Sequence, residues 1–261
     1  MKTLITLSGM SCSGKTVLAE YASKKENDDF VKVITSTTRP VRATEVNGID
    51  YHFMSVEEFR HAIDRDAMLE SEMFGENYYG TTMAELERVF ASGKLPFAVV
   101  EPNGANTIRA KGENREINVL NVFIDCPINV SLERWYDRYL SNVDKGDPQT
   151  DFFAKRIATT ITLEPLWKTA CDYQLVLPYG KNEQDSLNQL KEIKSFAQSG
   201  EWRNRNPSQK IRNANPTAAE LNKVKGSIEA LLNAQHDRES FVRLAQRIAE
   251  PRKEKEVGPC L

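Results

Sequence analysis

The chain lacks the features that mark membrane and secreted proteins. Its longest apolar runs, around Val99 and Val119, are far shorter than the roughly 20 residues that a membrane-spanning helix requires. Its first residues have neither the apolar length nor the small-residue cleavage site of a secretory signal. We therefore expect an intracellular, cytoplasmic protein with no membrane partner.

Cysteine is scarce as well, with 4 among 261 residues. The cysteines form no CxxC pair and no Cys/His spacing typical of a metal site, so we expect reduced thiols without a structural role. A formal net charge of −2 and a hydrophobic content of 40% do not match a disordered or fibrous protein. The length allows one large domain with an appendage.

Short apolar runs alternate with polar or helix-patterned sequence along much of the chain. This rhythm predicts an α/β fold, in which helices wrap a parallel sheet. The spacing of apolar residues between Lys15 and Lys25 predicts a helix directly after the first strand. The runs predicted as strands are residues 3–7, 31–35, 97–100, 119–124 and 173–177.

Two stretches interrupt this rhythm within residues 1–200, which we predict as the main domain. About residues 37–93 are charged and aromatic and are predicted as an insertion. About residues 134–160 contain SNVDKGDPQTD, whose Gly, Pro and Asp favour a mobile loop between two helical pieces. Residues 201–216 are too polar to pack and are predicted as a linker. Residues 217–261 are predicted as a helical extension, because they carry two apolar stripes at helical spacing.

The stretch GMSCSGKT, from Gly9 to Thr16, matches G-x-x-x-x-G-K-[ST] in full. A strand is predicted before it and a helix after it, which is the context of a phosphate-binding loop. The glycines let backbone N–H groups converge on an anion, the lysine reaches the outer phosphates, and the hydroxyl binds Mg²⁺. We therefore predict a nucleoside triphosphate site with Thr16 as metal ligand. The residues predicted to line it are Gly9, Ser11, Cys12, Ser13, Gly14, Lys15 and Thr16.

Two later blocks, STTRPVRATEVNGIDYHF (residues 36–53) and MLESEMFGENYYGTT (residues 68–82), resemble the guanylate kinase family. The family pattern runs STTR-x-P-R-x-G-E-x-x-G-x-D-Y-x-F, later [FL]-[IL]-E and then N-Y-Y-G-[ST]. Val41 and Thr44 stand where it has Pro and Gly. The resemblance spans roughly residues 3–180. It implies a P-loop NTPase-type sheet with an inserted nucleotide-monophosphate-binding subdomain and a lid, and the transfer of phosphate from ATP, with Mg²⁺, to GMP or dGMP.

The first block also suggests how a monophosphate is held. Arg39 and Arg42, together with the phenols of Tyr51 and Tyr79, can clamp a phosphate dianion through charge-assisted hydrogen bonds. In the family these positions hold the GMP phosphate. The alternative is that the arginines are solvated and the tyrosines lie in the core.

Glu70 is the base-reading residue that the resemblance implies. A carboxylate accepts from both N1–H and the exocyclic amino group of guanine, whereas adenine has an unprotonated N1 there. Without the resemblance, Glu70 would be interpreted as an ordinary glutamate on a helix surface. Thr35 and Thr81 stand where the family places hydroxyls near the guanine edge. The full set predicted to bind GMP is Thr35, Arg39, Arg42, Tyr51, Glu70, Tyr79, Thr81 and Glu101.

The chain departs from the family at VVEPNGA, residues 99–105, where D-[ILV]-D-x-Q-G-[AV] is usual. Val99 and Glu101 replace the two aspartates. A kinase of the same fold that acts on another monophosphate, deoxy or modified, is therefore one alternative. A non-catalytic binding module is another, although the intact phosphate-binding loop argues against it.

LERWYDRYL followed by TDFFAKRI resembles the family's R-x-x-x-R-G…R lid, with Tyr139 in place of the glycine. Lid arginines neutralise the charge that spreads over the transferring phosphoryl group and help to exclude water. The alternative for each is a salt-bridged helix surface. The residues predicted to be catalytic are Lys15, Arg39, Arg134, Arg138 and Arg156.

The predicted linker contains clustered basic residues, which suit contact with a nucleic-acid backbone. We expect instead that the two apolar stripes of the extension pack on the core or on a second subunit of a homo-oligomer.

Overall fold

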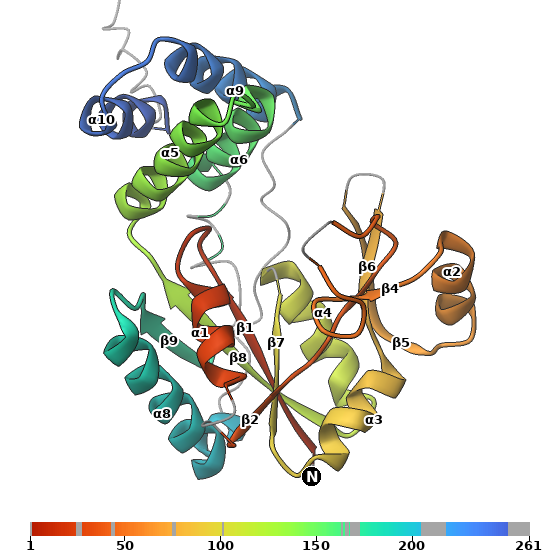
Figure 1. The fold of residues 1–261 in the computed structure, drawn as a ribbon. Coiled ribbons are helices and arrows are strands. Elements are labelled where there is room, and N and C mark those ends of the chain that lie inside the picture. The colour runs from red at the N-terminus through yellow and green to blue at the C-terminus, as the bar shows by residue number, and fades with distance from the viewer. Residues whose placement is uncertain are drawn as a thin grey trace, which may run out of the picture. The chain divides into compact units, whose positions relative to one another are not determined.

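The computed structural model describes residues 2–24, 28–42, 45–74, 77–100, 102–162, 164, 167, 173–204 and 218–249. The chain divides into two compact units (Figure 1). The first contains Met1–Gly9, Ser13–Asp125 and Lys168–Arg212, and the second contains Met10–Cys12, Cys126–Trp167 and Asn213–Leu261. Within the predicted phosphate-binding loop, Met10–Cys12 are thus assigned to the second unit, whereas Gly9 and the residues from Ser13 onward are assigned to the first.

The first unit is built on a five-stranded sheet of order β2-β7-β1-β8-β9, in which neighbouring strands pair in parallel. Central strand β1 is buried over its last six positions, as expected for a parallel strand that helices cover on both faces. The α/β prediction is confirmed. The strands are β1 (Lys2–Gly9), β2 (Phe30–Lys32), β7 (Leu95–Val99), β8 (Ile117–Asp125) and β9 (Leu175–Pro178).

Alternating residues of β1 face two separate cores. Ile5 and Leu7 belong to a cluster with apolar residues of α1 (Lys15–Ala22) and α8 (Glu183–Ser199). Leu4 belongs to a cluster with residues of α3 (Met83–Ala91) and α4 (Pro102–Glu113). The side-chain period of two in a strand explains this division. Helices therefore lie on both faces of the sheet (Figure 1).

The beginning of the predicted linker is in fact packed. Glu201–Asn204 form a 3-10 helix, η1, and the Trp202 side chain is only 2% exposed within the core that α8 covers. Its indole N–H donates to the Ala197 carbonyl at 3.2 Å. The prediction of a linker from residue 201 was wrong for these four residues, because one buried aromatic outweighs its polar neighbours. Residues 205–217 lie outside the described part of the chain.

The predicted insertion forms a sheet of its own, of order β4-β3-β6-β5. Its strands are β3 (Ser36–Thr37), β4 (His52–Phe53), β5 (Met68–Phe74) and β6 (Asn77–Thr82), and β5 and β6 pair antiparallel. Helix α2 (Val56–Asp64) begins at Ser55 with a capping box. Its buried Phe59 stacks on Tyr78 of β6, with ring centroids 5.3 Å apart, and so fixes the helix on the sheet.

The second unit is helical. It contains α5 (Ile128–Asp144), α6 (Thr150–Thr162), α9 (Ala218–Asn233) and α10 (Arg238–Ala249). Side chains from all four form one core, in which Tyr136 stacks on Phe241 at a centroid distance of 4.3 Å. Asp237 caps α10 by accepting from the Ser240 N–H at 2.9 Å. The apolar stripes of the extension thus pack on the two helices that carry the predicted lid arginines.

Among the residues that the structure describes, no helix is both long and apolar enough to span a bilayer.

Candidate functional site

The phosphate-binding loop follows β1 directly and leads into α1. Gly9 and Gly14 have φ angles of 153° and 91°, in the region that favours glycine. A Cβ atom on Gly9 would lie 2.4 Å from the Ile124 carbonyl oxygen, so no larger residue fits there. The N–H groups at the start of α1 add positive potential at the end of the loop.

Lys15 is folded back over this loop. Its ammonium donates to the Gly9 carbonyl at 2.9 Å and lies 3.4 Å from the Ser13 hydroxyl oxygen. Thr16 is exposed in the first turn of α1. The residues predicted to hold the outer phosphates and the metal therefore lie on a single turn of chain.

The middle of the loop, Met10–Cys12, belongs to the second unit and is bonded to other residues of that unit. Ser11 donates through its N–H to Glu164 Oε2 at 2.6 Å and through its hydroxyl to Glu164 Oε1. The Ser131 hydroxyl donates to the Ser11 carbonyl at 2.6 Å. Sequence reasoning missed Glu164 and Ser131, since their contacts with the loop connect positions far apart in the chain and no motif marks them.

The three predicted lid arginines have different surroundings. Arg134 of α5 donates through Nη1 to the Cys12 carbonyl, so it binds the loop backbone. Arg138 of α5 and Arg156 of α6 both lie over the ring of Trp135, with guanidinium carbons 5.2 Å and 5.4 Å from its centroid. These are cation–π distances, and the shared ring brings the two cations together.

The structure brings the predicted phosphate-clamp residues together. The Arg39 guanidinium carbon lies 5.5 Å from the Tyr51 ring centroid, and the Tyr51 and Tyr79 rings are 6.3 Å apart. Burial raises the pKa of Tyr51, so its phenol stays neutral and can donate. Arg42 is exposed, with 71% of its side chain accessible.

Glu45 is a further member of this cluster. Both of its carboxylate oxygens accept from Nη2 of Arg39, at 2.7 Å and 2.9 Å, and it also accepts from the Arg42 N–H at 3.0 Å. These bonds raise the pKa of Arg39 and lower that of Glu45. The signal for Glu45 was present in the sequence, as the glutamate of the STTR-x-P-R-x-G-E pattern.

Glu70 lies on β5 and is only 6% exposed, so its interpretation as a helix-surface residue is wrong. It pairs with Thr81 of β6, whose hydroxyl donates to Glu70 Oε1 at 2.9 Å. Burial raises the pKa of Glu70 to about 7, although the Thr81 hydrogen bond acts against the shift. Gly80 permits this approach, because a Cβ atom there would lie 2.4 Å from the Glu70 carbonyl oxygen.

Less is known of two other predicted GMP-binding residues, Thr35 and Glu101. Thr35 is half-buried just before β3, and its carbonyl accepts from the His52 N–H at 2.9 Å. Glu101 lies outside the described residues, whereas Val99 ends β7.

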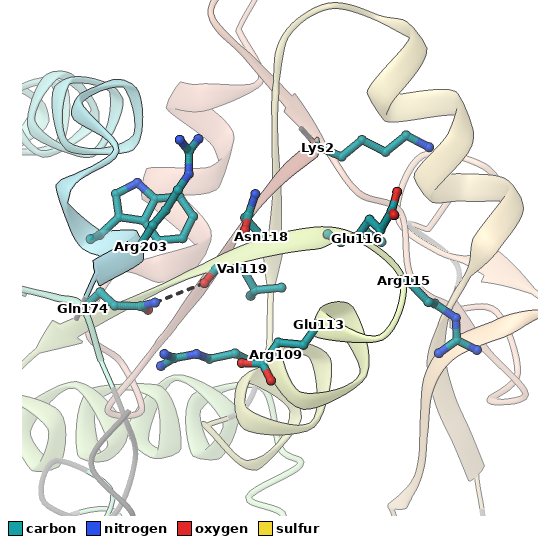
Figure 2. A pocket seen from close by; sticks show the side chains of 11 residues that line it. Lys2, Arg109, Glu113, Arg115, Glu116, Asn118, Val119, Gln174 and Arg203 are labelled. Carbon is teal, nitrogen blue, oxygen red and sulfur yellow. Dashed lines mark hydrogen bonds between the residues drawn. The ribbon is translucent and has the colours of Figure 1, made fainter. Parts of the chain in front are cut away.

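A cavity of about 740 Å³ lies elsewhere in the first unit. Lys2 at the start of β1, Asn118 at the start of β8, and Arg203 of η1 help to line it (Figure 2). Ligands of open α/β sheets bind at the carboxyl ends of the strands. This cavity is at the amino ends of β1 and β8, so it is separate from the predicted nucleotide site.

Comparisons with known proteins identify the family. A guanylate kinase family model matches residues 1–160. Guanylate kinase from Chlamydia trachomatis serovar D is 31% identical over 173 residues, which are 66% of this chain and 78% of the relative. Guanylate kinase from Chlamydia caviae is 37% identical over 131 residues, and the chain spans only 62% of its length.

A solved structure shows the same fold. The crystal structure of guanylate kinase from Anaplasma phagocytophilum superposes with a TM-score of 0.53 at 22% identity, covering 77% of this chain and 89% of that one. At that identity the superposition shows the fold alone, whereas the family model and the relative from Chlamydia trachomatis establish that the chain belongs to the guanylate kinase family.

Proposed function

We propose that this chain transfers the γ-phosphoryl group of ATP to GMP or dGMP, giving ADP and GDP or dGDP. The observation that carries the proposal is the buried pair of Glu70 and Thr81 on β5 and β6. Guanine offers two neighbouring donors, N1–H and the exocyclic amino group, to one carboxylate. Adenine would leave a buried carboxylate facing a lone pair, and an unpaired buried group is costly.

The acceptor phosphate would be held by the cluster of Arg39, Arg42, Tyr51 and Tyr79. Arg39 has five N–H donors on three nitrogens; Nη2 donates to the Glu45 carboxylate, and Nη1 donates to the Pro40 carbonyl at 2.7 Å. Its remaining donors suit a phosphate dianion. A phosphomonoester has a second pKa near about 6, so the attacking oxygen is already ionised and a general base is not needed.

On the donor side, Lys15 and the N–H groups of the loop would hold the triphosphate. Mg²⁺, when bound, neutralises phosphate charge, and the exposed hydroxyl of Thr16 would be its protein ligand. Among the described residues there is no group of three or more His, Cys, Asp or Glu side chains that could hold a metal. That fits Mg²⁺, which usually keeps waters and phosphate oxygens in its shell. Arg134, Arg138 and Arg156 remain the lid residues of this proposal.

The other predicted functions are not favoured. A binding module does not require an intact phosphate-binding loop, and a kinase for another base does not require a buried carboxylate paired with a hydroxyl. The cytoplasmic location, a homo-oligomeric state and a nucleic-acid contact stay predictions from the sequence.

A substrate panel tests the proposal. ADP formation is measured with ATP, Mg²⁺ and each of GMP, dGMP, AMP, dTMP and CMP. We expect GMP to exceed AMP at least about a hundredfold in kcat/KM. Glu70→Gln should reduce kcat/KM for GMP by a similar factor, whereas Glu87→Gln, at an exposed position of α3, should not. Equal turnover of AMP and GMP would refute the proposal.

A further inference from the structure

Glu164 is a buried carboxylate that the proposed reaction does not use. Its residue is 1% exposed. Its oxygens accept from the Ser11 N–H, from the Ser11 hydroxyl, and from the Thr160 hydroxyl at 3.2 Å. A buried polar group is tolerated only when hydrogen bonds compensate for its lost hydration. Two of the compensating donors here belong to the phosphate-binding loop.

The same short segment of the loop is bonded at two further points. Ser131 donates to the Ser11 carbonyl at 2.6 Å, and Arg134 donates to the Cys12 carbonyl. Cys12 has a φ angle of 59°, a left-handed conformation that residues other than glycine rarely adopt. Such a conformation persists only where its surroundings hold it. These bonds supply that restraint.

Two parts of the loop differ in what they bind, namely Ser11 and the segment from Ser13 to Thr16. Both donors of Ser11 are directed at Glu164, so phosphate binding falls to the N–H groups that follow, from Ser13 to Thr16. Cys12 joins the two parts through one peptide bond. That peptide carries the Ser13 N–H, so the direction of this group depends on how Cys12 is held.

We propose that Glu164 is a positioning residue for the triphosphate, which it serves by fixing Ser11 and thereby the phosphate-binding turn that follows. This inference rests on the proposed function, but it concerns the ATP side alone. Loss of a positioning role should weaken the binding of ATP alone. Loss of a purely structural role would instead weaken the binding of both nucleotides or of neither.

The test compares Glu164→Gln with the unsubstituted full chain. Calorimetry gives Kd for ATP and for GMP separately, and steady-state assays give the corresponding KM values. Leaving a buried donor without its partner commonly changes an equilibrium by about tenfold. We expect Kd and KM for ATP to rise about tenfold, while those for GMP change less than about twofold. Glu239→Gln, an exposed glutamate of α10 in the same unit, is the matched control and should change neither.

Two further variants keep the proposal falsifiable if Glu164→Gln folds poorly. Ser131→Ala removes the bond to the Ser11 carbonyl and should weaken ATP binding in the same selective way. Ser11→Ala combined with Glu164→Gln should bind ATP no more weakly than Glu164→Gln alone, because both changes break one link. An unchanged Kd for ATP in a folded Glu164→Gln chain, or parallel losses for ATP and GMP, would overturn the proposal. ATP binding needs no acceptor, so these outcomes stay separable from a failure of the chain to phosphorylate GMP.

Discussion

The raised pKa of Glu70 makes GMP binding depend on pH in a specific direction. Guanine donates to the carboxylate, so only the ionised form of Glu70 accepts both of its bonds. With a pKa of about 7, Glu70 is largely protonated at pH 6 and largely ionised at pH 8. GMP must therefore displace a proton when it binds at low pH, and its affinity should fall as the pH falls.

The size of the effect follows from the pKa. The apparent Kd for GMP scales as one plus the ratio of protonated to ionised Glu70, a factor of about 11 at pH 6 and about 1.1 at pH 8. We therefore expect a weakening of about tenfold between these two values. The phosphate of GMP, with a second pKa near about 6, adds a factor of about two if only its dianion binds.

Guanosine separates the two contributions, since it carries the base without the phosphate. In calorimetric titrations at pH 6, 7 and 8, guanosine should show the change of about tenfold, and GMP a change of about twentyfold. Glu70→Gln should abolish it for guanosine and leave only the phosphate contribution for GMP. A Kd for guanosine that is flat across this range in the unsubstituted chain would refute the reasoning.

Three other predictions concern Glu70, Glu45 and Phe241. Between pH 4.5 and 7 the folded chain keeps a proton on Glu70 that the unfolded chain releases. The free energy of unfolding of the unliganded protein should therefore fall by about 3 kcal/mol as the pH rises through this range. In Glu70→Gln this fall should be absent, and urea unfolding measures both proteins. Glu45→Gln should raise KM for GMP about tenfold without changing Kd for ATP, because Glu45 orients Arg39. A lower KM for GMP would contradict this and would mean that Glu45 competes with the phosphate for Arg39. Phe241→Ala should lower the free energy of unfolding, measured by calorimetry, by about 3–5 kcal/mol. Phe152→Ala, which removes a half-exposed ring, should have a much smaller effect. Equal effects would contradict the packing of α10 on α5.

The central fold could be predicted because its signals are local. The apolar run before Gly9 and the helical spacing after Lys15 define the strand–loop–helix unit without distant information. The strand predicted at residues 31–35 is shorter than expected, since β2 ends at Lys32. Strand ends are set by the partner, and β2 pairs with β7 over three residues only.

The candidate site could be predicted only in part, because its supporting contacts connect distant positions. Glu70 was assigned through a family pattern, whereas its own sequence neighbourhood pointed to a helix surface. The Ser11–Glu164 pair is separated by 153 positions, and no periodicity reports such a contact. The extension contains helices α9 and α10, but their packing partners lie on α5 and α6, far back in the sequence.

The two predicted phosphate sites share one physical design. In each, a carboxylate accepts hydrogen bonds from some donors of the site, and the other donors of the site are the ones proposed to bind phosphate. Glu45 accepts from Nη2 of Arg39, and Glu164 accepts from the N–H and the hydroxyl of Ser11. A donor group that is already held by protein bonds loses little freedom when a phosphate arrives, and dipoles fixed in advance stabilise charge without reorganising. Each carboxylate also places negative charge near an anion site, which weakens attraction. The arrangement is favourable only where orientation outweighs that repulsion, which is why neutral Gln at either position should weaken binding of one nucleotide and leave the other unaffected.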